Sequence, residues 1–181
     1  MSNVFFRIIA PDLDEDGAQR AARDVARHLV SRGYVSEAPV RYLPTSLPRY
    51  LPGPRYAELY MERPAKYGAA FGGVEITATR DPRFYENGQE GFTVSCPFCH
   101  QQAVGLLWQK AMTSYHYGSS GILLCHVCRK LERIDRWTYE PNVGFSRLCI
   151  SFWNAPHLRE DRLHELTEVV DSPVKVIYGA Y

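Results

Sequence analysis

The chain has 181 residues, of which 45% are hydrophobic and 23% are charged, and its 21 Lys and Arg residues balance 20 Asp and Glu residues to a formal net charge of +1. This is the composition of a globular protein, and the length suits one domain or one domain with a small insert. The balanced charge disfavours tight nucleic-acid binding through a strongly basic surface, although it is compatible with a local basic patch. No apolar run approaches the ~20 residues that span a bilayer. The N-terminus lacks the pattern of a signal peptide, so we expect a cytoplasmic protein with no membrane partner.

The chain begins with a predicted strand and helix. Residues 4–10 are apolar and rich in strand-forming types, and Pro11 ends the run, which predicts a strand. Acidic residues then crowd a helix start, apolar residues follow at helical spacing, and Gly33 follows a basic last turn. This pattern predicts a helix over residues 14–32.

Residues 40–67 are rich in proline, tyrosine and arginine. We expect this segment to be irregular apart from a helical turn near residues 57–61. One interpretation is a binding surface, because Tyr and Arg dominate protein-interface hot spots and basic residues between aromatic ones can clamp single-stranded nucleic acid. The candidate partner-binding residues are Tyr50, Arg55, Tyr56 and Tyr60. The other interpretation is a loop that wraps the core, with its tyrosines as pegs.

Four of the five cysteines form two C-x-x-C pairs in the middle of the chain. They are Cys96, Cys99, Cys125 and Cys128, and 25 residues separate the two pairs. Two thiolates on one tight turn can occupy adjacent corners of a tetrahedron, and a second turn brought back by a hairpin supplies the other two corners. We therefore predict a closed, structural Zn²⁺ site in a zinc-ribbon insert at residues 91–131. Within this insert we expect short strands over 104–108 and 121–124, and before it a strand over 73–79 that ends at Asp81-Pro82.

Other chemistries fit these cysteines less well. Disulfides are disfavoured in a chain without an export signal, and a thioredoxin-like centre uses a single C-x-x-C. A nucleobase deaminase needs an H-x-E motif, which this sequence lacks. His100, His116 and His126 lie close enough in sequence to replace a thiolate, but surface imidazoles are the simpler interpretation. Cys149 stands alone and is expected to be a small buried hydrophobe.

The C-terminal part predicts a strand over 144–153, a helix over 156–170 capped by Asn154, and a strand over 174–178. Without the inserted segments the order of elements is βαββαβ, which is the ferredoxin-like order. We therefore predict an α+β fold, in which a ferredoxin-like βαββαβ platform carries a zinc ribbon in the hairpin between its second and third strands. The two halves of the platform would be residues 1–90 and 132–181.

Three motifs together resemble a known group of sequences. These are Cys96-Pro97-Phe98-Cys99, the run Phe152-Trp153-Asn154-Ala155-Pro156-His157-Leu158, and the C-terminal run over residues 174–179. In them the chain resembles a group of uncharacterised proteobacterial proteins of similar length, often labelled "sugar ABC transporter ATPase". A P-loop needs G-x-x-x-x-G-K-[ST], and this chain has no Gly-Lys dipeptide. We therefore reject ATPase activity, and the resemblance implies a family without implying a function.

The leading functional hypothesis is a non-catalytic zinc-ribbon protein that recognises a protein partner, with an inhibitor or immunity protein as one concrete version. The alternative is nucleic-acid binding, in which Arg129, Arg133 and their basic neighbours contact phosphates. Arg129 and Arg133 are partner-binding candidates in either case. An enzyme is a third possibility, although no nucleophile–base motif is readable. It would depend on residues that no motif groups, such as Cys149, His157, His164 and Asp135.

Overall fold

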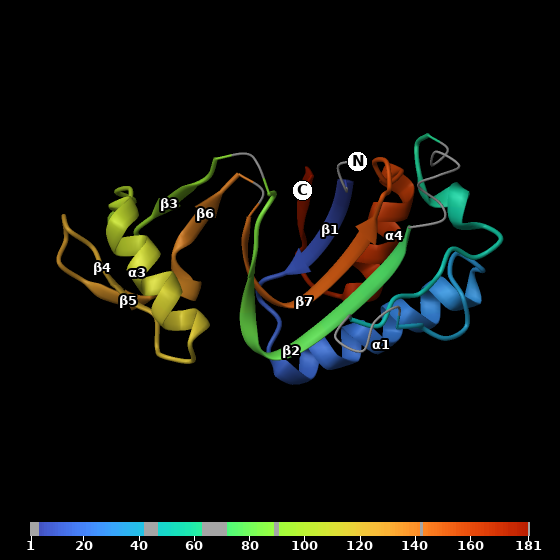
Figure 1. The fold of residues 1–181 in the computed structure, drawn as a ribbon, viewed down its shortest axis with the longest axis horizontal. Coiled ribbons are helices and arrows are strands. Elements are labelled where there is room, and N and C mark those ends of the chain that lie inside the picture. Colours follow the sequence, from blue (N-terminus) through green and yellow to red (C-terminus); the bar gives the residue numbers. More distant parts are fainter. Residues whose placement is uncertain (1–3, 42–46, 63–71, 89–90, 142, 181) are drawn as a thin grey trace.

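The computed structural model describes residues 4–41, 47–62, 72–88, 91–141 and 143–180, and it has an α+β fold (Figure 1). In chain order the elements are β1 (Val4–Ala10), α1 (Glu15–Ser31), the 3-10 turn η1 (Tyr56–Leu59), β2 (Gly73–Tyr85), β3 (Thr93–Ser95), α3 (Gly105–His116), β4 (Ile122–Leu124), β5 (Leu131–Arg133), the 3-10 turn η2 (Ile134–Arg136), β6 (Thr138–Glu140), β7 (Gly144–Trp153), α4 (Glu160–Val170) and β8 (Lys175–Ala180).

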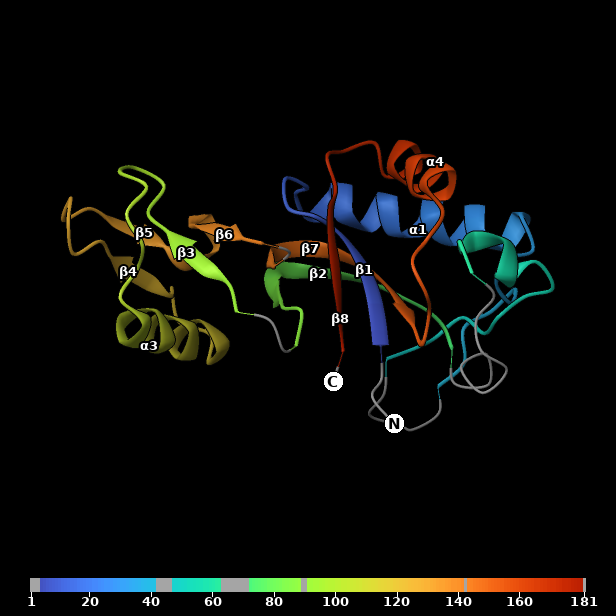
Figure 2. The same cartoon turned by 90° about the horizontal axis from the view of Figure 1, so that it is seen from above.

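The largest sheet has four strands in the order β2-β7-β1-β8, and every neighbouring pair is antiparallel. Helices α1 and α4 lie side by side on one face of this sheet, as Figure 2 shows from above. We call this sheet with its two helices the platform. Alternate residues of the central strands point into the layer between sheet and helices, where Ile8 and Ile150 are fully buried. The predicted strands over 4–10 and 144–153 are confirmed, because β1 and β7 have these bounds. Nearly all of their residues are buried, on both faces of the sheet.

Helix α1 confirms the helix predicted over 14–32. Its N-cap is Asp14, whose carboxylate accepts a hydrogen bond of 2.7 Å from the backbone N–H of Gly17. Its buried face carries Ala18, Val25 and Leu29 at helical spacing. Small residues at the start of this face let the helix pack closely on the sheet.

Helix α4 begins at Glu160, so the prediction of a helix from residue 156 with Asn154 as its cap was wrong. The backbone just before α4 forms hydrogen bonds with the segment around η1 instead of continuing the helix. The carbonyl of His157 accepts a hydrogen bond from Met61, and the N–H of Arg159 donates to the carbonyl of Leu59. These contacts hold the chain extended, and Asn154 itself has a positive φ of 51°.

Strand β2 continues beyond the predicted end at Asp81-Pro82 and stops only at Tyr85. The register with β7 shifts between Ala78 and Arg83, so residues 79–82 form a bulge. Proline is tolerated at a bulge because its missing N–H removes no hydrogen bond from the ladder. The sequence rule that a proline ends a strand therefore failed at this point.

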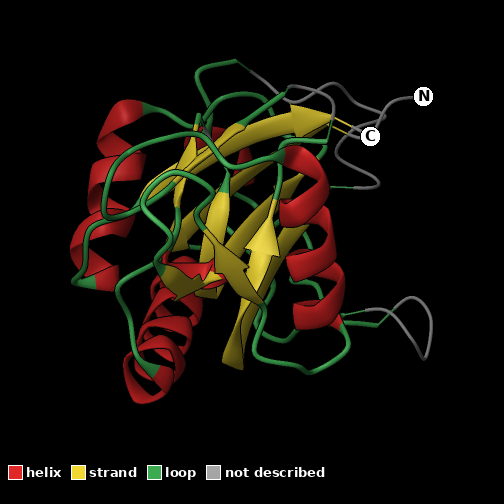
Figure 3. Ribbon diagram, turned by 90° about the vertical axis from the view of Figure 1, so that its left-hand side faces the viewer, coloured by secondary structure: helices red, strands yellow, loops and turns green. Residues whose placement is uncertain are grey.

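The chain between β2 and β7, residues 86–143, forms a second body that we call the cysteine unit. It contains two small antiparallel sheets, β3 with β6 and β4 with β5, together with α3 (Figure 1). Figure 3 views the molecule from the side of this unit and shows helices of the whole chain on both sides of the strands; α3 is the α-helix that belongs to the unit. The unit has a hydrophobic cluster of its own, which includes Leu123, Ile134, Trp137 and Tyr139. Because β5, η2 and β6 contribute to the unit, it extends beyond the predicted insert of 91–131.

The strand predicted over 104–108 is replaced by the first turn of α3, so that prediction was wrong, whereas β4 confirms the strand over 121–124. The N–H groups of Leu107 and Trp108 both donate to the carbonyl of Val104, which starts the helix. The side chains that pack into the cluster are Trp108, Ala111, Met112 and Tyr115. Their spacing is helical. Within the described part of the chain, no helix combines the length and the apolar character needed to cross a bilayer.

Candidate metal centre

The two C-x-x-C motifs fold into two turns of the same geometry. In the first, the N–H of His100 donates to the carbonyl of Cys96 over 2.9 Å, and the N–H of Cys96 donates to the carbonyl of Gln101 over 2.9 Å. In the second, Arg129 donates to Cys125 over 3.0 Å and Cys125 donates to Lys130 over 2.9 Å.

Each turn is closed by a residue in the left-handed region, His100 with φ 59° and Arg129 with φ 61°. That conformation costs a residue with a side chain some strain. The two turns therefore share one backbone conformation, so each can present its pair of sulfurs in the same way.

The four sulfur atoms lie close together in one group. The Sγ atoms of Cys96 and Cys128 are 3.7 Å apart, those of Cys99 and Cys125 are 3.6 Å apart, and all four lie within 4.8 Å of one another. A tetrahedral ion with metal–sulfur bonds of about 2.3 Å requires sulfur–sulfur edges of about 3.8 Å. A disulfide would need about 2.05 Å. The predicted ligand set Cys96, Cys99, Cys125 and Cys128 can therefore hold a metal ion.

Burial and local hydrogen bonds shift the pKa values of two of the cysteine thiols. Cys96 and Cys125 are buried, whereas Cys99 and Cys128 are half-buried. The backbone N–H of Cys128, helped by that of Val127, lowers the pKa of the Cys125 thiol to about 6. At Cys99 the N–H of Gln101 also lowers the pKa, but burial and the neighbouring thiols outweigh it and raise the pKa to about 11. Metal binding to cysteine requires the thiolate form, and the backbone N–H groups around Cys125 favour that form.

The candidate histidines take no part in this group. His100, His116 and His126 are exposed, and the one group of metal-ligating side chains within the described ranges contains only the four cysteines. Four thiolates fill a tetrahedron and leave no position for water or substrate. A metal ion held by this group would cross-link two turns of the chain.

No family profile matches the chain, and no match to it was found among the curated proteins or the solved structures. The resemblance to the proteobacterial group therefore stays a prediction that rests on its motifs.

The hairpin of β4 and β5 exposes an apolar face beside the cysteines. Leu124 pairs with Leu131 and Ile122 with Arg133, so these four side chains share one face of the hairpin. Ile122, Leu124 and Leu131 are 45%, 39% and 63% exposed, whereas Leu123 on the opposite face is 3% exposed and packs into the cluster. We call Ile122, Leu124 and Leu131 the hairpin face.

Sequence reasoning missed the hairpin face. The run Ile122-Leu123-Leu124 has no alternation of apolar and polar residues that would show which side chain points outward. Of the predicted binding residues on this unit, Arg133 lies on the hairpin face and its guanidinium pairs with Asp135 over 2.8 Å. Arg129 is exposed on the second turn.

The predicted binding residues of the proline- and tyrosine-rich segment lie elsewhere, on the platform. Tyr56 and Tyr60 are 4% and 3% exposed, and their rings meet edge to face at 5.1 Å. The hydroxyl of Tyr56 also accepts a hydrogen bond from the N–H of Gly73. Tyr50 is half-buried, and its backbone pairs with Val74. Where it is described, the segment wraps the core with its tyrosines inside, which corresponds to the second interpretation, and residues 42–46 and 63–67 lie outside the described residues.

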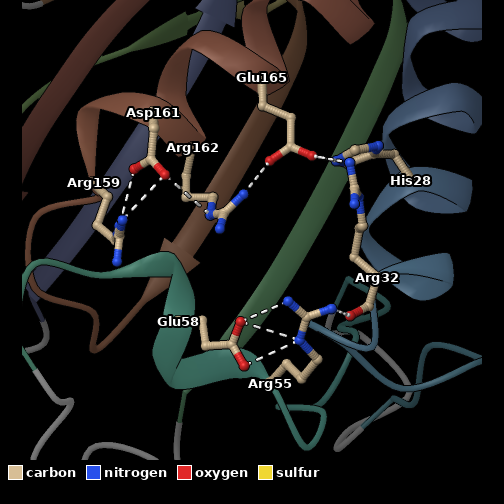
Figure 4. Close-up of polar contacts among 8 residues, drawn as sticks. All are labelled: His28, Arg32, Arg55, Glu58, Arg159, Asp161, Arg162 and Glu165. Carbon is tan, nitrogen blue, oxygen red and sulfur yellow. Dashed lines mark hydrogen bonds and ion pairs between the residues drawn. The ribbon is translucent and has the colours of Figure 1, made fainter.

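Arg55 belongs to a network of charges that joins η1 to the two helices (Figure 4). Its guanidinium donates to the carboxylate of Glu58 and to the carbonyl of Arg32. Glu165 on α4 pairs with Arg162, Arg32 and His28 at 2.8, 2.8 and 3.1 Å. Burial of the Glu165 carboxyl raises its pKa, but these three neighbours outweigh burial and the net pKa is lowered. Because each acid in this network faces a cation, its role is to tie the helices together.

The residues considered for catalysis are dispersed. Burial raises the pKa of the Cys149 thiol to about 11, which leaves it a poor nucleophile, and its sulfur lies 3.4 Å from the hydroxyl of Ser151. His157 stacks on Tyr178 with ring centroids 4.3 Å apart, and His164 faces Glu168. Among the described residues, no hydrogen bond joins Cys149 to either histidine.

Proposed function

We propose that this protein is a non-catalytic zinc-ribbon protein that recognises a protein partner through its hairpin face. The observation that carries this proposal is the hairpin itself, which buries Leu123 and leaves Ile122, Leu124 and Leu131 exposed beside the four-cysteine group. Covering three such side chains favours association by about 1 kcal/mol each. Because the hairpin is already ordered, little of that gain is spent on ordering it.

Zinc is the ion that we propose for the centre, as a structural cofactor. A tetrahedral set of four thiolates suits Zn²⁺ or an iron–sulfur centre, and zinc needs no redox partner. When bound, it cross-links two turns that are far apart in the chain. The cysteine side chains hold it, and the surrounding cluster of Leu123 and Ile134 keeps those side chains in place.

The charges next to the hairpin define the partner further. Arg129 and Lys130 are exposed, and the ammonium of Lys130 lies 4.4 Å from the ring centroid of Phe98 on the first turn. Glu132, the nearest acid in sequence, accepts a hydrogen bond from the backbone of Arg133. A surface with an apolar centre and an acidic rim is the best complement to this arrangement. An inhibitor or immunity protein in the cytoplasm, acting on an enzyme with such a surface, is a concrete version of this function.

Nucleic-acid binding is the second candidate, and the exposed cations Arg129, Lys130 and Arg136 favour it. The ion pair between Arg133 and Asp135 removes one cation from such a role. Phosphate contacts would give binding that weakens steeply as salt is added. Apolar contacts through the hairpin face would resist salt.

For the platform we propose the ferredoxin-like fold. The strand order β2-β7-β1-β8, with all neighbours antiparallel and with α1 and α4 on one face, supports this assignment.

The test compares two substitutions at equally exposed leucines. Leu131→Asp places a charge on the hairpin face, and Leu106→Asp places one on α3, where Leu106 is also 63% exposed. Proteins that co-purify with the tagged wild-type chain from its own host should be lost with Leu131→Asp and kept with Leu106→Asp, at unchanged zinc content. Equal recovery with both variants would contradict the proposal. Co-purifying nucleic acid, released by salt or nuclease, would favour the second candidate.

A further inference from the structure

A large cleft lies between the bulged strand β2 of the platform and helix α3 of the cysteine unit. Its volume is about 1050 Å³, which is at the upper end of the range for small-molecule sites. The hairpin face does not line it. The cleft is therefore a second candidate site, and the inference drawn from it does not depend on the proposed function.

The bulge of β2 is held in place from three sides. The hydroxyl of Tyr115 on α3 donates a hydrogen bond of 2.6 Å to the carbonyl of Pro82. The hydroxyl of Thr79 donates to the carbonyl of Asp81 over 2.8 Å, and the guanidinium of Arg147 donates to the carbonyl of Arg80 over 2.9 Å. Bulges are common next to functional sites because they re-aim side chains. This one is fixed to both bodies of the molecule.

The bulge brings positive charge to the cleft. Arg80 and Arg83 line it and are exposed, and no ion pair joins either of them to an acid within the described ranges. Arg7, which is 8% exposed on β1, lines the cleft as well and donates to the carbonyl of Glu86. An arginine offers a planar fork of donors that matches phosphate and carboxylate oxygens.

Aromatic side chains form the other wall of the cleft. Trp108 and Tyr115 line it from α3. Their orientation is fixed, because the indole of Trp108 donates to the hydroxyl of Tyr139 and the ring of Tyr115 meets Phe145 edge to face at 5.2 Å. Fixed aromatic surfaces bind the face of a planar ring at low entropic cost.

We propose that this cleft binds a small organic phosphate that carries an aromatic ring. The phosphate oxygens accept hydrogen bonds from Arg80 and Arg83, and the ring lies against Trp108 and Tyr115. Two arginines offer more donors than the two oxygens of a carboxylate use, whereas a phosphate with three free oxygens can engage both.

Acidic residues set the size of the ligand. Asp81 and Glu86 also line the cleft, so two negative charges accompany its three arginines. An extended chain of phosphates would meet these acids at close range, and like charges repel. A single phosphate group held between Arg80 and Arg83 avoids that repulsion, which favours a small ligand over a nucleic acid.

The test is calorimetric titration of the 181-residue chain, as purified and with its metal content measured, with defined probes. Phenyl phosphate and adenosine 5′-monophosphate should bind at one site per chain. Inorganic phosphate, which lacks the ring, and benzoate, which lacks the phosphate, should each bind about tenfold more weakly. Absence of binding by both aromatic phosphates at millimolar concentration would overturn the proposal.

Matched variants locate the binding. The double variant Arg80→Gln and Arg83→Gln should weaken phenyl phosphate binding at least tenfold, whereas Arg129→Gln with Lys130→Gln, which removes the same charge from the second cysteine turn, should leave it unchanged. All four positions are exposed, so the fold should persist, and zinc content with far-ultraviolet circular dichroism checks that it does. Equal weakening in both double variants would show non-specific attraction to positive charge and would overturn the assignment to the cleft.

Discussion

The metal centre makes its clearest prediction through the five cysteines of the chain. Cys125→Ser removes one of the four sulfurs, and Cys149→Ser removes the lone thiol of the platform. Both residues are 1% exposed, so the two substitutions change the same atom at the same depth. The hydroxyl of a serine at 149 would keep a polar partner, because Ser151 lies beside it.

The expected magnitude follows from the number of ligands. Structural zinc sites contribute about 10–16 kcal/mol at neutral pH. An equal share for each of four thiolates is about 3 kcal/mol, so losing one should weaken zinc binding by about two orders of magnitude. The small sheets of the cysteine unit have two strands and three residue pairs each, which is too little to be stable without the metal. The platform has a separate core between its sheet and α1 and α4.

The assay measures zinc after equilibration with a chelator of known affinity and maps backbone amide exchange by mass spectrometry. Cys125→Ser should lose zinc and exchange rapidly over β3 to β6, while β1, β7 and α1 stay protected. Cys149→Ser should keep both its zinc and its protection. The reasoning is refuted if Cys125→Ser retains zinc with the affinity of the wild type, or if the platform unfolds together with the cysteine unit.

Two further predictions concern the platform. Gly179→Ala should lower the free energy of unfolding by about 1–3 kcal/mol, because a Cβ at Gly179 would overlap the backbone carbonyl of Asn87. The control is Gly91→Ala, whose Cβ would meet nothing within 4 Å. Thermal unfolding should give a lower Tm for Gly179→Ala than for Gly91→Ala, and equal Tm values would contradict the packing around Gly179. The lowered pKa of Glu165 predicts a pH dependence, since its carboxylate stabilises the fold fully above the unfolded pKa of about 4.3 and loses that effect as pH falls through the lower folded value. Urea unfolding between pH 2 and about 6 should show this loss in the wild type and a flatter profile in Glu165→Gln, and identical profiles would argue against the ion pairs with Arg162 and its neighbours.

The elements that the sequence predicted correctly are those whose patterns are decided locally. Strand β1 is a short run of strand-forming apolar residues that ends at Pro11, and helix α1 has apolar residues at a period of 3.6 that form its buried face. The start of α4 could not be read in this way. The backbone of His157 and Arg159 is bound by residues about a hundred positions earlier in the chain, and no local pattern reports that.

The grouping of the four cysteines was predictable for a different reason. A C-x-x-C turn fixes the distance between two sulfurs by itself, so only the meeting of the two turns depends on the fold. The hairpin face, which we propose as a partner surface, had no such signal. Tyr56 and Tyr60 belong to residue types common at interfaces, yet the fold uses them as core, whereas Leu131, a residue type common in cores, is left outside.

The cysteine unit leaves and rejoins the main sheet at adjacent points, because Tyr85, the last residue of β2, pairs directly with Gly144, the first residue of β7. A two-residue Asn-Gly turn could close the same gap. The unit is thus an insertion at the end of the β2–β7 hairpin, and a short turn in its place would leave the register of these two strands unchanged. Phe84 and Phe145 lie at the boundary between the two bodies. Both belong to platform strands, yet both pack into the hydrophobic cluster of the cysteine unit. If the unit were removed, both phenylalanines would lose these contacts, so each would have to be replaced by a polar residue in the remaining sheet.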